Sequence, residues 1–127
     1  MDERFYEGIR EFNAGRFFEA HDVLEDLWHG YREPDRVFLQ ALIHSAVGLY
    51  HLENDNFKGA RSQLRKACSK LEAFRPTYWR VSVDLLYESL EDQLKILESR
   101  ERGGGKSIEN HDKPRIQLST GNYLTVF

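Results

Sequence analysis

The sequence predicts an all-α protein: a single-domain bundle of about five helices, built from two helical-hairpin-like units and followed by a C-terminal extension. Three observations predict this class. Apolar residues recur at helical spacing through most of the chain, with turn residues between the segments. A pattern of residues recurs after 40 positions, as in helical-hairpin repeats. Gly103-Gly104-Gly105 then opens a polar linker, so we expect a bundle over residues 1–101 and a linker and tail over 102–127.

Five segments are expected to be helical, and residues that favour helix ends bound each of them. Their approximate ranges are 2–13, 17–28, 35–53, 57–74 and 83–100. Gly15 can supply the left-handed turn after the first helix. Pro34 limits the second helix because the residue before proline avoids the helical region, and Asp35 is a candidate N-cap for the third.

The repeat relates the first two helices to the third and fourth. Its matched pairs are Phe12 and Leu52, Phe17 and Phe57, Ala20 and Ala60, Leu24 and Leu64, and Leu27 and Ala67. A small residue in the first turn of a helix allows its neighbour to approach closely, which is typical of helical hairpins. Two copies without a third favour a compact bundle over an open solenoid.

The C-terminal tail has a different periodicity. Ile116 and Leu118 alternate with polar residues, and Leu124 and Val126 do so again after the turn signal Gly121-Asn122. This alternation predicts strand-like segments. An isolated hairpin is only marginally stable, so the sequence leaves open whether the tail docks on the bundle or is mobile.

The composition predicts a cytoplasmic protein. One cysteine excludes an internal disulfide framework and fits a reducing compartment. No basic region precedes an apolar stretch near the start, as a secretory signal would require. The longest apolar stretch, around residues 46–52, is far shorter than the roughly 20 residues of a membrane-spanning helix, so no membrane partner is expected.

Polar residues interrupt the apolar faces of the second and third helices. His21 lies within the apolar stripe of the second helix, with Glu25 one turn later. The third helix is apolar nearly all round, which predicts a central buried helix, yet Gln40, His44 and His51 share one of its faces. A polar group at such a position needs a partner, because unpaired burial is costly.

Two runs of sequence carry a family resemblance: FNAGRFFEAHDVLEDLW and, after it, FLQALIHSAVGLYHLENDNFKGA. Together they resemble the DUF309 family, a domain of unknown function. The matching residues are Glu19, Ala20, His21, Glu25 and Trp28 in the first run, and Gln40, His51, Gly59 and Ala60 in the second. With the later SVDLL run, the resemblance extends from about Phe5 to Leu97 and implies an all-α bundle without an established activity.

The chain also departs from the family pattern. Asp22 stands where glutamate is more common, Ala41 where glycine is usual, and His44 where glutamine is usual. The tail lies outside the pattern.

We define the predicted polar cluster as seven residues of the second and third helices: Glu19, His21, Glu25, Trp28, Gln40, His44 and His51. The favoured interpretation is an uncharacterised binding or interaction module in which this cluster is a hydrogen-bond network or lines a small-ligand pocket. The partner is an unidentified protein or small molecule, and a homo-oligomer is compatible with the sequence. Glu19 is placed to interact with the dipole of the second helix.

The alternative is a metal-assisted hydrolase. A histidine and a glutamate four residues apart can bind one cation, and His44 or His51 could add a ligand. No catalytic residue is assigned and no metal is expected; His21, Glu25 and His51 are the candidate ligands if one binds. No cofactor motif is present. Whether the protein is an enzyme is left open.

A second alternative arises from the charge distribution. The net charge is −3, yet seven basic residues and one acid lie between residues 56 and 80. Lys58, Arg61 and Arg65 share a face of the fourth helix, which would suit weak nucleic-acid binding. The pI near 6.0 makes a nucleic-acid partner the less favoured interpretation and a solvated face the simpler one. Cys68, near Leu64 and Leu71, is expected to be buried and inert, and an exposed Tyr78-Trp79 pair would indicate a binding surface.

Overall fold

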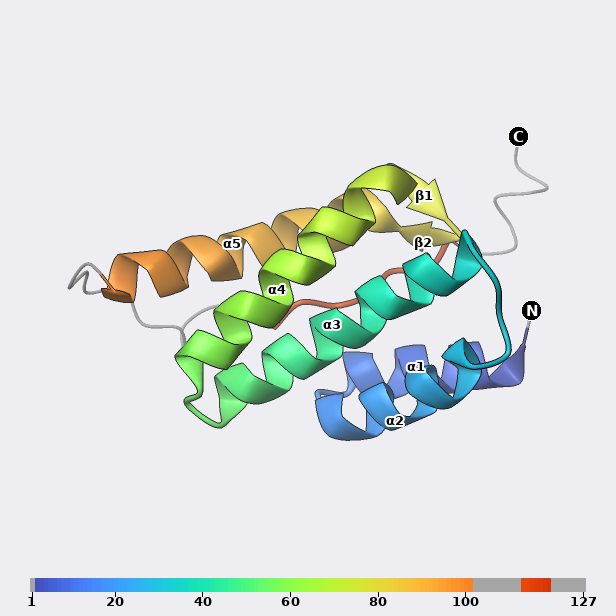
Figure 1. Ribbon diagram of the computed structural model, residues 1–127, viewed down its shortest axis with the longest axis horizontal. Helices are drawn as coiled ribbons and strands as arrows, with labels where there is room; N and C mark the ends of the chain where they lie inside the picture. Colours follow the sequence, from blue (N-terminus) through green and yellow to red (C-terminus); the bar gives the residue numbers. More distant parts are fainter. Residues whose placement is uncertain (1, 102–112, 120–127) are drawn as a thin grey trace.

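The computed structural model describes residues 2–101 and 113–119. Its helices are α1 (Glu3–Asn13), α2 (Phe17–Trp28), α3 (Asp35–Glu53), α4 (Phe57–Leu71) and α5 (Val83–Glu101), with a short 3-10 helix over Glu72–Phe74 and two short strands, β1 (Thr77–Tyr78) and β2 (Val81–Ser82) (Figure 1). The all-α class and the five predicted helices are confirmed. Within the described ranges, each helix is too short or too polar to span a bilayer.

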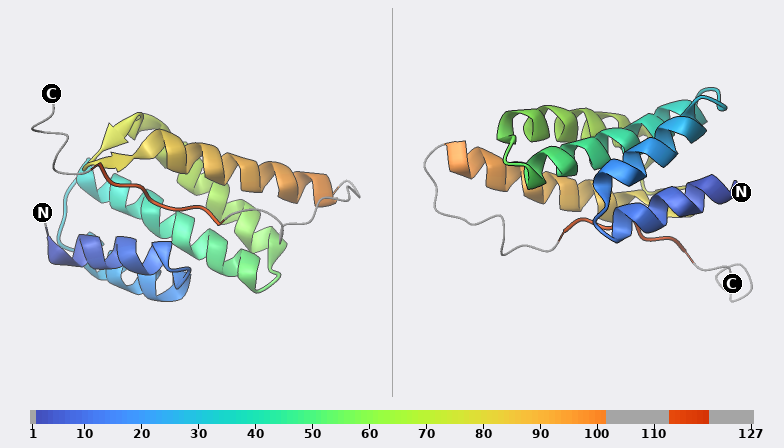
Figure 2. Two further views of the ribbon diagram at one scale, coloured as in Figure 1. Left: turned by 180° about the vertical axis from the view of Figure 1, so that it is seen from behind. Right: turned by 90° about the horizontal axis from the view of Figure 1, so that it is seen from below.

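The helices form two layers. α3 lies between α2 and α4 and packs against both of them (Figure 1). α1 and α5 lie behind this row, and residues 113–119 run between them on the rear side (Figure 2). As predicted, α3 is central, and nine of its residues are buried.

The two hairpins, α1 with α2 and α3 with α4, repeat the same local geometry. Gly15 and Asp55, which are 40 positions apart, both have a left-handed backbone, with φ values of 81° and 60°. A Cβ atom on Gly8 would lie 2.8 Å from Leu24 Cδ2, and one on Gly48 would lie 2.7 Å from Leu64 Cδ2. The sequence repeat therefore extends to a glycine that allows a buried leucine of the next helix to approach closely.

The predicted helix over 57–74 is observed as α4 followed by the 3-10 helix Glu72–Phe74, whereas the predicted loop after it contains two short strands. α4 ends at Leu71, and β1 and β2 pair as a small antiparallel hairpin whose turn residues, Trp79 and Arg80, have φ values of 48° and 64°. Two successive residues with positive φ match the twist of such a hairpin. The hairpin places the Tyr78 ring 4.9 Å from that of Phe38. The aromatic pair Tyr78-Trp79 is thus packed against the core, so it is not the exposed pair that would have indicated a binding surface.

The N-terminus of α3 also differs from prediction. Pro34 occupies the N-cap position without a side-chain cap, and Asp35 is the first helical residue. The carboxylate of Asp35 instead accepts a hydrogen bond from the Tyr78 hydroxyl, 43 residues later. A long-range partner that sequence spacing does not reveal therefore replaces the local cap.

The described part of the tail is docked. Ile116 is 2 % exposed and belongs to the hydrophobic core, and Leu118 forms an isolated antiparallel bridge with Val81. The alternation around Ile116 and Leu118 thus matches an extended segment. The predicted Gly121-Asn122 turn and the second alternating stretch lie outside the described residues.

Candidate functional site

The α2 part of the predicted polar cluster is held together by helical spacing. His21 Nε2 lies 3.2 Å from Glu25 Oε2, one turn away, and His21 Nδ1 lies 3.3 Å from Asp22 Oδ1. The imidazole is mostly covered, whereas both carboxylates are largely exposed. Each ring nitrogen of His21 thus faces a carboxylate oxygen of α2, and these two contacts fix the orientation of the ring.

The α3 part of the cluster lies on one partly exposed stripe. Gln40, His44, Val47 and His51 are half-buried, while most residues between them are buried. His44 Nδ1 lies 2.7 Å from Gln63 Oε1 of α4. Burial lowers the pKa of His44; the hydrogen bond to Gln63 opposes this shift, and nearby Lys70 and Lys66 reinforce it. His51 Nδ1 lies 3.4 Å from the side-chain nitrogen of Asn56. The face predicted to bear polar side chains therefore faces α4 and solvent.

An aromatic row joins the two parts. The Phe18 ring lies 5.9 Å from the His21 ring and 5.4 Å from the Tyr50 ring, and the Tyr50 ring lies 6.2 Å from the His51 ring. Phe18 and Tyr50 are 49% and 37% exposed. We call the surface formed by Phe18, His21, Glu25, Tyr50 and His51 the α2–α3 surface. Among the described residues, no hydrogen bond or ion pair connects His21 or Glu25 to Gln40, His44 or His51.

The remaining members of the predicted polar cluster lie apart from this row. Glu19 is exposed in the first turn of α2, the position that favours a negative charge. Trp28, at the far end of α2, stacks beneath the Arg36 guanidinium, whose central carbon lies 3.9 Å from the ring centroid. The seven residues thus lie in separate places. Four are on α2, and Gln40, His44 and His51 are on the face of α3 that meets α4 and solvent.

The metal hypothesis requires at least three ligands that converge on one point. In the part of the chain that the structure describes, no three His, Cys, Asp or Glu side chains form such a group. His21 and Glu25 supply a pair on α2, whereas His44 and His51 are engaged with Gln63 and Asn56. The geometry therefore adds no support to the metal-assisted hydrolase.

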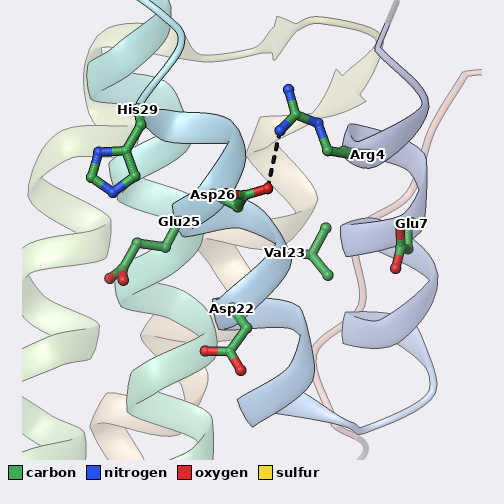
Figure 3. Close-up of a pocket in the computed structure, with 7 residues that line it drawn as sticks. All are labelled: Arg4, Glu7, Asp22, Val23, Glu25, Asp26 and His29. Atoms are coloured by element: carbon green, nitrogen blue, oxygen red, sulfur yellow. Dashed lines mark hydrogen bonds and ion pairs between the residues drawn. The ribbon is translucent and has the colours of Figure 1, made fainter.

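An acidic depression of about 460 Å³ lies between α1 and α2. It is lined by Arg4, Glu7, Asp22, Val23, Glu25, Asp26 and His29 (Figure 3). Arg4 Nη1 lies 3.0 Å from Asp26 Oδ2, and Arg4 also pairs with Asp2, so part of the negative charge is compensated. Glu25 is the member shared with the predicted polar cluster, and it extends the acidic character of α2 to the α2–α3 surface.

The opposite side of the α2–α3–α4 row is basic. α4 contains five basic residues and no acid, and Lys58, Arg65 and Lys66 are exposed. Within the described residues, none of these three side chains forms an ion pair. Arg61, the third member of the predicted basic face, is half-buried.

Phe18 and Tyr50 are exposed aromatic residues that lie outside the predicted polar cluster. The 40-residue repeat contains the signal that could have identified them. It aligns buried Phe17 with another aromatic residue, Phe57. In contrast, it aligns Phe18 with Lys58 and Tyr50 with Arg10, and both Lys58 and Arg10 are exposed. An aromatic residue at the position of an exposed charge is expected to be a surface aromatic.

The fold and the site define an all-α domain of paired helical hairpins with an aromatic and acidic surface. Residues 5–63 match the family model DUF309, Domain of unknown function, so this part of the chain is similar to that family. This segment covers most of α1, all of α2 and α3, and the start of α4, and it contains all seven members of the predicted polar cluster. The comparison with curated proteins gives no match.

Proposed function

We propose that the protein is a binding module and that the α2–α3 surface is where it contacts a protein partner. The partner is expected to offer a segment with apolar and basic side chains. The observation that carries this proposal is the pair of exposed aromatic rings, Phe18 and Tyr50, packed against each other across two helices.

Exposed aromatic rings support a protein partner for energetic reasons. Aromatic side chains are enriched at protein interfaces because each buries a large apolar area with few rotatable bonds. Single apolar residues are common on protein surfaces, but Phe18 and Tyr50 are adjacent and flanked by polar side chains. An apolar centre with a polar rim is the usual composition of a contact surface.

The charge of α2 supports the basic character of the partner. α2 contains Glu19, Asp22, Glu25 and Asp26 and no lysine or arginine, and all four carboxylates are exposed. Complementary charges at the rim of an interface increase the association rate and favour one partner over others. The acidic depression beside α2 extends the same negative potential.

Site-specific photo-crosslinking tests this proposal. A benzophenone amino acid is placed at Phe18 in the full chain, produced in its native cell type, and Leu85 on α5 serves as the matched control because it is also 49% exposed. We expect a discrete adduct from position 18 and none from position 85. Charge reversal by Glu25→Lys should diminish the adduct, since it removes the complementary charge.

The adduct alone does not establish the function, so the crosslinked protein is then identified and purified. Its affinity for the full chain should fall about tenfold or more with Phe18→Ala, the cost of a central aromatic contact, and stay unchanged with Leu85→Ala. Equal loss for both variants, or equal adducts at both positions, would contradict the proposal.

The basic face of α4 supports a second candidate, weak nucleic-acid binding. Lys58, Arg65 and Lys66 are exposed on a helix without acidic residues, which is the arrangement that binds phosphates. Fluorescence anisotropy with a labelled single-stranded RNA should then show affinity that declines with salt and is reduced by Lys58→Glu with Arg65→Glu. This candidate is excluded if no RNA binding is seen at low salt, or if the double substitution leaves the affinity for RNA unchanged.

A further inference from the structure

Residues 113–119 lie on the bundle as an extended segment between α1 and α5 (Figure 2). Their side chains alternate: Pro114 and Ile116 are buried, whereas Lys113, Arg115 and Gln117 are exposed. A period of two is the signature of an extended chain with one face against a core. The segment thus presents its apolar side chains to the bundle at every second position.

Asn13, at the end of α1, holds the backbone of this segment. Its side-chain oxygen accepts a hydrogen bond from the Ile116 N–H at 2.7 Å, and its side-chain nitrogen donates one to the Ile116 carbonyl at 2.9 Å. Both polar backbone groups of one residue are therefore satisfied by one amide. Such a contact recognises the backbone and is independent of the side chain that the residue carries.

The β hairpin holds the next residues. β2 pairs with β1 along one edge, and along its other edge the Ser82 N–H donates to the Gln117 carbonyl at 2.9 Å. The Ser119 N–H donates to the Arg80 carbonyl at 2.8 Å, and the Arg80 guanidinium donates to the Ser119 carbonyl. The segment thus adds to the free edge of a two-stranded sheet, which is one of the recurring ways in which proteins bind peptides.

We propose that Asn13 together with Arg80, Val81 and Ser82, the tail site, is a binding site for extended peptides. Residues 113–119 are its resident ligand, and a partner protein that offers an extended Pro-x-Ile-x-Leu segment binds there in trans. The backbone contacts supply register and direction, and the buried positions of Pro114 and Ile116 supply the apolar selectivity. This site is separate from the α2–α3 surface, so neither proposal depends on the other.

The test must release the resident segment without shortening the chain. Ile116→Asp does so, because a carboxylate at a position that is 2 % exposed cannot remain buried without a partner. The probe is a fluorescent synthetic peptide of residues 113–119, Lys-Pro-Arg-Ile-Gln-Leu-Ser. We expect saturable anisotropy with the Ile116→Asp chain.

The wild-type chain should bind the same probe at least about tenfold more weakly. A tethered segment competes at an effective concentration on the order of millimolar, so the resident ligand excludes a micromolar peptide. Far-UV circular dichroism verifies that the Ile116→Asp chain keeps its helices. If it does not, Ile116→Ala, which removes the apolar contact without introducing a charge, replaces it in the same assay.

Matched variants distinguish specific recognition from adhesion. Adding Asn13→Ala to the released chain should weaken probe binding about tenfold or more, since two hydrogen bonds are lost, whereas Asn54→Ala, at the end of α3, should leave it unchanged. A probe with Gln117→Ala should bind normally because that side chain is exposed, and a probe with Ile116→Asp should not bind. The proposal is overturned if the Ile116→Asp chain does not bind the unchanged probe, or if it binds the unchanged probe and the Ile116→Asp probe with equal affinity. It is also overturned if Asn13→Ala leaves the affinity for the unchanged probe the same.

Discussion

The close approach of α3 and α4 at Gly48 yields a prediction with a defined sign. A methyl group at position 48 would lie 2.7 Å from Leu64 Cδ2 and 2.8 Å from Leu64 Cγ. Leu64 is fully buried, so its side chain cannot withdraw into solvent. Gly48→Ala therefore forces either Leu64 out of its rotamer or the two helices apart.

Two opposing terms set the magnitude. Replacing glycine by alanine within a helix stabilises it by about 1 kcal/mol. Overpacking a well-packed core costs typically about 1–3 kcal/mol. Because the contact involves Cγ as well as a terminal methyl, we take about 2 kcal/mol for the overlap and expect a net destabilisation of about 1 kcal/mol.

A double-mutant cycle isolates the clash. Leu64→Ala alone should lower the free energy of unfolding by about 3 kcal/mol, as for a buried leucine. In that background the two closest atoms are gone and the Gln63 Cβ atom, at 3.3 Å, is the remaining close contact. Gly48→Ala should then stabilise the protein by up to about 1 kcal/mol, which gives a coupling of up to about 2 kcal/mol.

Urea unfolding followed by circular dichroism at 222 nm measures all four proteins. Gly30→Ala is the control, because a Cβ there would lie at an ordinary 3.6 Å from its nearest neighbour, and it should change stability little. The reasoning is refuted if Gly48→Ala has the same effect with and without Leu64. The repeat predicts the same coupling between Gly8 and Leu24 in the first hairpin.

Two further predictions concern titratable groups whose pKa values are shifted by burial. Burial lowers the pKa of His44 below its usual 6.5, so the unfolded chain binds the proton more tightly than the native chain does. The free energy of unfolding should therefore fall as the pH drops below about 6.5. His44→Gln should flatten that decline in urea titrations between about pH 8 and about pH 5, and an unchanged slope would contradict the assignment. Burial also raises the pKa of the Cys68 thiol to about 11, so the native protein should react with a disulfide reagent at pH 8 about 100-fold more slowly than the unfolded chain. Equal rates would show that the thiol is accessible in the native state.

The positions of the helices follow from local information. Gly15 and the Asn54–Asn56 turn separate segments whose apolar residues keep helical spacing, and the observed ends of α2 and α3 coincide with the predicted ranges. The 40-residue repeat also predicts the paired hairpins, since matched turns produce matched backbone conformations. These features depend on residues that are near one another in sequence.

The candidate site could be predicted only in part. Spacing along α2 places Glu25 one turn from His21, and the pair is observed at 3.2 Å. Spacing along α3 places Gln40, His44 and His51 on one face, but it does not reveal that this face meets Gln63 of α4. Which helices are neighbours, and how they are rotated, depends on packing of the whole core, so the aromatic contact of Phe18 with Tyr50 could not be derived from spacing.

By itself, the sequence determined the helical class, the limits of most helices, the repeated hairpin and the alternation of the tail around Ile116. The tertiary structure alone decided what those elements contact. It paired Asp35 with Tyr78, exposed Phe18, and docked residues 113–119 through Asn13 and the edge of β2. The physical reason is that helix formation and periodicity act over a few residues, whereas these contacts join groups far apart in sequence whose meeting depends on how the entire core packs.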